Sequence, residues 1–480
     1  MSAVNDRLAK VWSRLGPRFL PFADGASATL PLSQLLRLSL FQISVGMSLV
    51  LLNGTLNRVM IVELGVVASV VATMVALPVL LAPLRLLLGH RSDYHRSVLG
   101  WRRVPYMWLG TMVQFGGLAI MPFALIVLSG DADAPAFLGP MAAGLAFLMV
   151  GGGMQTVQTA GLALASDLAE PEKRHRVVAL LYVMLLVGVM VASIAFSLAL
   201  ESFSQIRLIQ VVQGTALVTL VLNLASMWQQ EARRPRSAGA VDAQPQFSET
   251  WREITRNRQC VRLLAAVALG TAGFAMQDIL LEPYGGEILR LSVAGTTVLN
   301  ALVAFGALAG FALSARLLDN GGDPVRVAAY GILSGIIAMS AVVFSAPLAS
   351  ANTFRLGAVL LGFGTGLFSV GTLTAAMLLV RDGQGGRILG AWGAVQATAA
   401  GLAISGSGLL RDAVVSVAGS GALGPAMSGP ASGYMVVFHV EIAFLFAGLV
   451  AIGPLVSLPL RSRDRSEHRK AGFGLAEFPS

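Results

Sequence analysis

The sequence contains few charged residues, one cysteine and none of the common catalytic motifs. Only 12% of its 480 residues are Asp, Glu, Lys or Arg, about half of the share in an average soluble protein, which excludes a water-soluble globular domain. The single cysteine, Cys260, excludes an internal disulfide and a cysteine-cluster metal site. The sequence also lacks His-Glu-x-x-His, phosphate-loop, dinucleotide-binding and Ser-His-Asp patterns. We therefore expect no enzyme and no intrinsic metal site.

Long apolar runs dominate what is present. Hydrophobic residues make up 55% of the chain and the mean hydropathy is +0.73. The runs are about 20 residues long, which suffices to cross a hydrocarbon core of about 30 Å. We predict an all-α integral membrane protein with twelve transmembrane helices, over 36–57, 62–88, 105–129, 136–165, 177–200, 206–228, 261–281, 293–317, 325–348, 354–380, 388–410 and 434–459. The turn between the first two is expected at the polar residues from Asn53 to Glu63.

Lys and Arg are unevenly distributed over the two membrane sides. The side that holds both termini carries 29 of the 34, and the opposite side carries Arg58, Arg207, Arg290, Arg355 and Arg411. Because short cytoplasmic loops retain Lys and Arg, both termini are expected in the cytoplasm. This bias accounts for the net charge of +9. No exposed basic stretch indicates a nucleic-acid partner.

Polar segments divide the chain into two halves. Near the N-terminus, Leu8 and Trp12 lie on one helical face and Arg7 and Lys10 on the other, which is typical of a helix on the membrane surface. A solvated lead-in is the alternative. The expected organisation is a cytoplasmic amphipathic segment (1–34), a six-helix bundle (35–228), a cytoplasmic linker (229–260), a second six-helix bundle (261–460) and a cytoplasmic tail (461–480).

The two halves resemble each other weakly. At an offset of 225 to 226 residues, Asn53 aligns with Asp278 and Asn57 with Glu282. Two parallel six-helix repeats are the architecture of the major facilitator superfamily, which the chain therefore resembles.

One loop supports this resemblance. Gly89 and Asp93, followed by the pair Arg102-Arg103, resemble the superfamily's signature between the second and third helices, and Asp319 occupies the aligned position in the second half. We expect these residues to form a cytoplasmic latch, in which the acid pairs with Arg side chains or a helix N-terminus. An ordinary basic loop is the alternative.

Several longer strings resemble one narrower family. They include Gly54-Thr-Leu-Asn-Arg-Val-Met-Ile-Val-Glu63, Gln277-Asp-Ile-Leu-Leu-Glu-Pro-Tyr284, Arg176-Val-Val-Ala-Leu-Leu-Tyr182 and Val437-Phe-His-Val-Glu441. These strings, which extend over nearly the whole chain, are similar to those of the bacteriochlorophyll delivery family, also called the PucC family. The sixth span, with Leu208-Ile-Gln-Val-Val-Gln213, most resembles its LhaA branch, associated with core light-harvesting complex 1. Relatives tied to the peripheral antenna share most of these motifs.

This resemblance implies a non-enzymatic assembly factor that binds or delivers bacteriochlorophyll to light-harvesting apoproteins. The implied cofactor is non-covalent bacteriochlorophyll a. The implied partners are light-harvesting antenna polypeptides, bacteriochlorophyll synthase, the reaction centre and membrane lipid. The implied location is the bacterial inner, intracytoplasmic photosynthetic membrane. A proton-coupled secondary transporter of a small amphipathic solute is the alternative function.

Polar residues of the first and seventh spans are candidates for binding pigment or substrate, namely Gln277, Asp278, Glu282, Tyr284, Asn53 and Asn57. Asp278 and Glu282 share a helix face because they are four residues apart. They are expected either to close the periplasmic end and orient a pigment, or to cap the helix end near Pro283 and pair with Arg58 or Arg290. Asp278 is expected in the outer third of the membrane, which leaves a midplane nearly free of charge and disfavours an ion-coupled pump.

Two further sets of polar residues are candidates. Gln155, Gln158 and Thr159 share one face of the fourth span, where uncharged groups suit either a tetrapyrrole ring or hydrogen bonds between helices. His439 is the one histidine within a span, and neutral imidazole is a common metal ligand. We expect His439 either to ligate the pigment magnesium or to bond to a neighbouring helix.

Pairs of glycines at Gly-x-x-x-Gly spacing are frequent in the second half, at Gly306/Gly310, Gly331/Gly335 and Gly362/Gly366. This spacing permits helices to approach closely. We expect these pairs to pack helices within the bundle, in preference to docking single-span antenna polypeptides.

Overall fold

A computed structural model of the chain describes residues 31–80, 101, 103–130, 135, 137–170, 174–231, 257–378, 385–422, 424, 427 and 429–456. These residues form helices and connecting turns, with no strand among them. The predicted all-α class is therefore confirmed. The predicted surface helix at the N-terminus, most of the linker and the tail lie outside the described residues.

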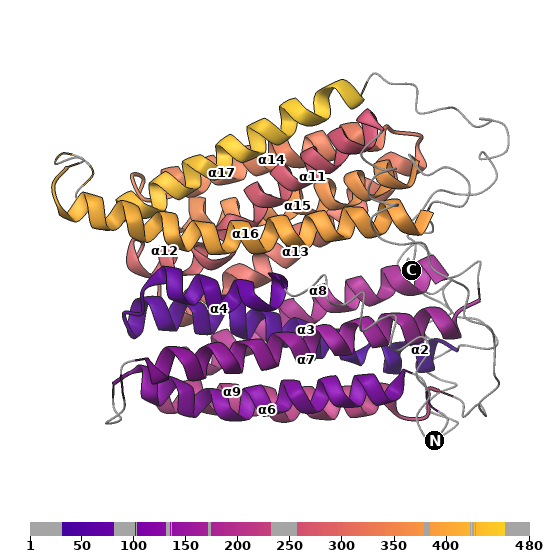
Figure 1. Cartoon of the computed structure of the whole chain (residues 1–480), viewed down its shortest axis with the longest axis horizontal. Coiled ribbons are helices and arrows are strands. Elements are labelled where there is room, and N and C mark those ends of the chain that lie inside the picture. Colours follow the sequence, from indigo (N-terminus) through magenta and orange to yellow (C-terminus); the bar gives the residue numbers. More distant parts are fainter. Residues whose placement is uncertain are drawn as a thin grey trace.

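The first bundle, drawn from indigo to magenta in Figure 1, runs from Leu32 to Met227. Its helices are α2 (Leu32–Leu38), α3 (Leu40–Leu49), η2 (Val50–Leu56), η3 (Val59–Glu63), α4 (Ala68–Leu80), α6 (Val104–Leu128), α7 (Leu138–Leu168), α8 (Arg174–Ala199) and α9 (Gln205–Met227).

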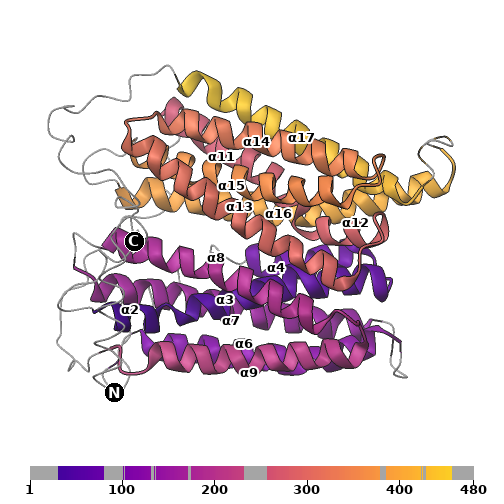
Figure 2. The same ribbon diagram turned by 180° about the vertical axis from the view of Figure 1, so that it is seen from behind.

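The second bundle, which continues through orange to yellow, runs from Arg258 to Leu455 and lies alongside the first in both views (Figures 1 and 2). Its helices are α11 (Arg258–Ala275), η6 (Met276–Ile279), α12 (Leu281–Glu287), α13 (Val293–Asp319), α14 (Pro324–Ser345), α15 (Ala351–Leu378), α16 (Gly385–Gly419), α17 (Ala431–Ile452) and η8 (Gly453–Leu455). Where the bundles meet, α4 packs on α16 and α8 packs on α13.

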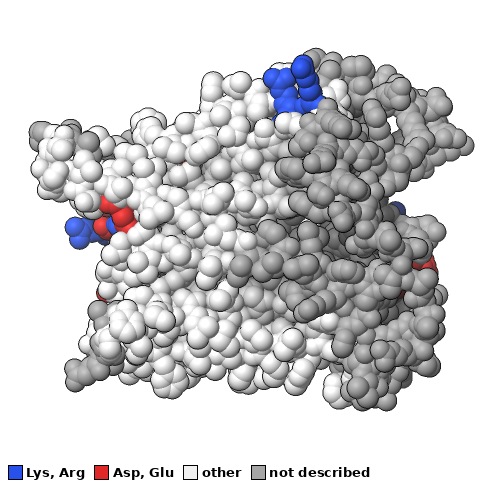
Figure 3. Space-filling model, in the orientation of Figure 1, with Lys and Arg blue, Asp and Glu red and all other residues white. Residues whose placement is uncertain are grey.

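The helices are built to cross a membrane. Eleven helical segments in the described ranges are long and apolar enough to do so, and α4 is a shorter apolar helix, because its expected range continues beyond the described residues. Large apolar side chains such as Phe123 and Leu198, each 70% exposed, point outward. On the face drawn in Figure 3, the described Lys, Arg, Asp and Glu residues gather near the two ends of the bundle. The chain is thus a multi-pass membrane protein.

The first span is longer than the sequence indicated. The turn predicted between Asn53 and Glu63 lies instead at Leu64–Val67, where Gly65 adopts φ +65°. Asn53, Asn57 and Arg58 belong to the helix. The prediction was wrong because hydropathy treats these residues as loop formers, whereas the second bundle supplies hydrogen-bond partners for Asn57 and Arg58.

Close helix packing in the second bundle depends on the glycine pairs. A Cβ on Gly306 or Gly362 would overlap the backbone of α15 or α13, respectively. A Cβ on Gly331 would lie 2.6 Å from the carbonyl oxygen of Gly364. The glycines therefore let α13, α14 and α15 meet backbone to backbone, and the predicted packing role is confirmed.

Candidate functional site between the two bundles

The seventh span is broken where it meets the first span. α11 ends at Ala275, the 3-10 turn η6 follows, and α12 begins at Leu281. Pro283 accounts for part of this break, because it has no N–H to donate to the carbonyl oxygen of Ile279, four residues earlier. That oxygen instead accepts a hydrogen bond of 2.8 Å from Nδ2 of Asn57 in the first bundle. The break thus supplies a backbone acceptor that joins the two bundles.

Asn57 and Arg58 lie between two wide turns of the first span. The segments η2 and η3 are π-helical, and such turns are frequent at functional sites. Nδ2 of Asn57 also donates to the carbonyl oxygen of Asn53 at 3.0 Å. Arg58 is 3% exposed and donates to Glu63 at 2.6 Å and to the carbonyl oxygen of Leu291 in the second bundle at 3.2 Å.

Glu282 is buried between the bundles. Its carboxylate accepts a hydrogen bond from Nδ2 of Asn300 on α13. Gly54 faces this pair, because a Cβ there would overlap both Glu282 and Asn300. Arg58 forms its ion pair with Glu63, and both alternatives from the sequence for Asp278 and Glu282 stay predictions.

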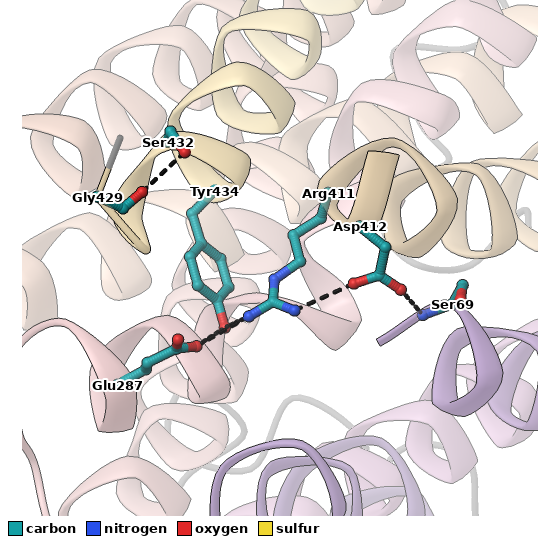
Figure 4. Close-up of polar contacts among 7 residues, drawn as sticks. All are labelled: Ser69, Glu287, Arg411, Asp412, Gly429, Ser432 and Tyr434. Carbon is teal, nitrogen blue, oxygen red and sulfur yellow. Dashed lines mark hydrogen bonds and ion pairs between the residues drawn. The ribbon is translucent and has the colours of Figure 1, made fainter. Parts of the chain in front are cut away.

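A second group of polar contacts joins α4 to α16 (Figure 4). The guanidinium of Arg411 contacts Glu287 and Asp412 at 3.0 Å each, and the hydroxyl of Tyr434 donates to Glu287 at 2.7 Å. Asp412 in turn accepts a hydrogen bond of 2.6 Å from the backbone N–H of Ser69. Four side chains and one backbone N–H group therefore link α12, α16 and α17 of the second bundle to α4 of the first.

Arg411 was expected in an external loop, after a helix ending at residue 410. This expectation was wrong, because α16 continues to Gly419 and contains Arg411. Glu287 and Asp412 neutralise the guanidinium, so a charge that hydropathy assigns to a loop is accommodated within the helix.

Four hydrogen bonds join the two bundles at the end of the molecule where η3 and α12 end and α4 and α13 begin, and we call them the distal seal. The distal seal comprises the bonds from Asn57 to Ile279, Arg58 to Leu291, Ser69 to Asp412 and Ser197 to Ala294. Each bond connects one bundle to the other.

Asp278 and Glu441 lie on two elements of the second bundle that pack against each other, η6 and α17. Asp278 lies in η6, where its carboxylate accepts a hydrogen bond of 2.6 Å from Nε2 of Gln277. Glu441 lies ten residues into α17, about 15 Å along the helix. Its side chain has no exposed surface. Glu441 thus places an ionisable group in the middle of a span, which the depth of the seventh span alone did not indicate, and the nearly uncharged midplane stays a prediction.

The amide candidates of the fourth span bond to neighbouring helices. Nε2 of Gln155 donates to the carbonyl oxygen of Pro78 in α4 at 2.8 Å, and Nε2 of Gln158 lies 3.4 Å from Oε1 of Gln42 in α3. The hydroxyl of Thr159 donates to the carbonyl oxygen of Gln155. These contacts match the interhelical alternative, and contact with a pigment stays a prediction.

Tyr284 occupies a fully buried aromatic cluster. Its ring lies 5.7, 5.6 and 5.2 Å from the rings of Phe354, Tyr434 and Phe438. Its hydroxyl lies 3.4 Å from the carbonyl oxygen of Val342. In this arrangement Tyr284 packs the core of the second bundle around the distal seal.

His439 lies on the outer face of α17. It is exposed, and its Nδ1 lies 2.6 Å from the carbonyl oxygen of Met435. A carbonyl oxygen can only accept, so Nδ1 carries the proton and Nε2 is the remaining nitrogen. His439 shares an exposed stripe with Ala443, Phe446 and Val450. The side chain is therefore directed toward the lipid-facing surface.

The latch residues are described in part. Gly89, Asp93 and Arg102 lie outside the described residues. Arg103 contacts Asp167 of α7 at 3.1 Å and its backbone N–H donates to Glu231 after α9. Asp319 is exposed at the end of α13. The latch stays a prediction.

A family model described as "PUCC protein" matches residues 55–459 of the chain. The chain belongs to this PUCC protein family. "Protein PucC" of Rhodovulum sulfidophilum is 54% identical over 418 residues, which cover 86% of this chain and 91% of that protein. The "Bacteriochlorophyll synthase 44.5 kDa chain" of Rhodobacter capsulatus is 30% identical over 78% of this chain and 86% of its own length.

Among solved structures, a bacterial homologue of the human lysosomal transporter Spinster, in an inward-facing and unoccupied conformation, matches with a TM-score of 0.62. The match has 15% sequence identity and covers 89% of this chain and 98% of that chain. It establishes that this PUCC family member shares the fold of that transporter.

Sequence reasoning missed several residues of this PUCC family chain. Asn300 and Asp412 were not singled out because their partners, Glu282 and Ser69, are distant in sequence. Glu441 was considered only in relation to His439. Its signal was available, since an ionisable residue in the middle of an apolar span marks a functional candidate.

Proposed function

We propose that the chain is an assembly factor of the photosynthetic antenna that binds or delivers bacteriochlorophyll to light-harvesting apoproteins, with core light-harvesting complex 1 as its client. The observation that carries this proposal is the PUCC family match over residues 55–459. The relative named for bacteriochlorophyll synthase supports a connection with this pigment. The proposed partners are antenna polypeptides, the synthase and the reaction centre, within the bacterial intracytoplasmic membrane and with both termini in the cytoplasm.

His439 is the proposed axial ligand of the pigment magnesium. Its Nδ1–H is directed to the carbonyl oxygen of Met435, which fixes the ring and leaves Nε2 as the nitrogen able to ligate. The exposed Phe446 and Val450 extend the same stripe and would contact a flat macrocycle. Bound bacteriochlorophyll would supply light absorption at this surface. The chain's own residues hold and orient the pigment and exclude water from its face.

A position on the outer surface favours sideways transfer within the membrane. The distal seal joins the bundles at one end, whereas His439 is reached from the lipid without opening the seal. Antenna apoproteins also lie in the lipid, so pigment can be handed to them along the bilayer.

The test is the absorption spectrum of the full-length chain, affinity-purified in mild detergent from pigment-producing cells, together with its co-purifying polypeptides. We expect near-infrared absorption of bacteriochlorophyll a and enrichment of core antenna polypeptides. An unrelated membrane transporter with the same tag is the control. A colourless protein, combined with normal antenna abundance after deletion of its gene, would contradict the proposal.

Secondary transport is the second candidate, and the burial of Glu441 in the middle of a span is the observation that favours it. Buried ionisable groups in membrane helices serve coupled ion pathways. In sealed vesicles, a transporter accumulates an amphipathic solute under a proton gradient, and an assembly factor does not.

A further inference from the structure

Glu441 has an unusual environment for a carboxyl group. Its side chain has no exposed surface, and neither carboxyl oxygen has a hydrogen-bond partner among the described residues. An ionised carboxylate in a low-dielectric interior is strongly destabilising unless it is paired or neutralised. Glu441 therefore requires a neutralising partner in this conformation.

The charged groups of the surrounding helices do not provide that partner. α17 packs against α11, α14, α16 and η6. Ionisable residues of these elements lie toward the helix ends, except for Asp278 of η6, and comprise Arg258, Cys260, Arg262, Arg326, Tyr330, Arg387, Arg411 and Asp412. On α17 itself, Tyr434 bonds to Glu287 and His439 lies on the outer face. Among these elements, η6 therefore brings Asp278 to the middle of the bundle beside α17, and Asp278 carries the same sign of charge as Glu441.

A proton fits this site better than a metal ion. Hard cations require several oxygen ligands at once, and the described residues contain no group of three or more metal-ligating side chains. Oδ1 of Asp278 already accepts a hydrogen bond from Gln277. A proton needs one carboxyl oxygen and no additional space.

Asp278 offers a route for this proton. Its side chain is exposed, although its neighbours Gln277 and Ile279 are buried. It also lies in the 3-10 turn that interrupts the seventh span, next to the carbonyl of Ile279 that forms part of the distal seal. A change of charge at Asp278 therefore acts on the segment that joins the two bundles.

We propose that Asp278 and Glu441 form a proton-binding site, in which Glu441 holds one proton while the distal seal is closed and Asp278 exchanges it with water. Release of this proton leaves two like charges facing each other, which favours movement of η6 relative to α17. The inference requires neither pigment nor an antenna partner, and it deepens the transport candidate, which rests on the same buried Glu441.

Infrared difference spectroscopy of the purified full-length protein in nanodiscs tests this proposal. Spectra recorded in acidic and alkaline buffer should show the carbonyl stretching band of a protonated carboxylic acid. We expect Glu441→Gln to abolish this band and the matched control Glu201→Gln, at an exposed position, to retain it. In Asp278→Asn the band should persist, but its shift after transfer to heavy water should develop more slowly.

Three results would overturn the proposal. These are a band of equal intensity in Glu441→Gln, an unchanged rate of hydrogen exchange in Asp278→Asn, and loss of the wild-type band on addition of sodium or magnesium chloride at constant pH. The last result would assign the site to a metal cation. If Glu441→Gln does not fold, the exchange rate in Asp278→Asn decides, because that variant retains Glu441.

Discussion

Nδ2 of Asn57, in the first bundle, donates a hydrogen bond of 2.8 Å to the carbonyl oxygen of Ile279, in the second bundle. The acceptor is available because Pro283 lacks the N–H that would otherwise bond to it. An interruption within one helix and an amide on another are therefore parts of one contact, which belongs to the distal seal.

Asn57→Ala is expected to loosen the distal seal. A buried hydrogen bond contributes about 1 kcal/mol, so the ratio of open to closed molecules should rise about fivefold. The reporter is a disulfide between Ser197→Cys and Ala294→Cys in a Cys260→Ser background, since the parent residues are bonded at 3.0 Å. The disulfide yield should fall when Asn57→Ala is added, because fewer molecules are closed. Asn352→Ala, at an exposed position of the second bundle, should leave the yield unchanged. Equal yields in both variants would refute this role of Asn57.

Gly54→Ala is expected to destabilise the protein, because its Cβ would overlap Glu282 and Asn300. Overpacking of this kind costs about 2 kcal/mol, which thermal unfolding in detergent should report as a lower melting temperature. The cost should shrink in an Asn300→Ala background, where one of the two overlapping side chains is removed and Glu282 is no longer held by Asn300. Gly152→Ala is the control, since no atom lies within 4 Å of its added Cβ. Similar effects of Gly54→Ala and Gly152→Ala would contradict the geometry.

Arg411→Ala is expected to weaken the contact between α4 and α16. It leaves Glu287 and Asp412 without their cation, and loss of hydrogen bonds to charged groups costs about 2 kcal/mol. Arg355→Ala removes an exposed arginine that contacts Asn352 at 3.4 Å, and its effect should stay below about 0.5 kcal/mol. Thermal unfolding measures both variants, and equal stabilities would show that the network contributes nothing.

His439→Ala is expected to lose most of the bacteriochlorophyll that co-purifies with the wild-type protein, because it removes the ligating Nε2. The pigment-to-protein ratio, taken from the absorption spectrum, is the measurement. Leu402→Ala, at another lipid-facing position that is 61% exposed in the wild type, should retain the wild-type ratio. Wild-type pigment content in His439→Ala would exclude this residue as the ligand.

The helical architecture could be predicted from local sequence. Apolar runs located the membrane spans. Gly306 and Gly362 indicated where helices meet, because their Gly-x-x-x-Gly spacing can be recognised within a single helix. Partners distant in the chain could not be predicted in the same way. Asn57 and Arg411 carry polarity that predicts a turn or a loop. Both lie inside a span, where other helices supply the acceptors Ile279 and Glu287.

The sequence named candidate residues of the seventh span but not the buried Glu441. The seventh-span residues Gln277, Asp278 and Glu282 do lie near the contact between the bundles. Glu441 was missed because the relationship between α17 and η6 depends on tertiary packing. A hydropathy profile averages a single carboxyl group with the apolar residues around it.

The two bundles contribute unequally to their junction. In three of the four bonds of the distal seal, Asn57, Arg58 and Ser197 use side chains as donors, whereas Ile279, Leu291 and Ala294 offer main-chain oxygens. Replacing an acceptor residue with another that preserves the local fold leaves its oxygen in place, but replacing a donor removes the bond. During evolution, the second bundle can therefore vary at its three acceptor positions, while the first bundle must keep a donor side chain at each of its three.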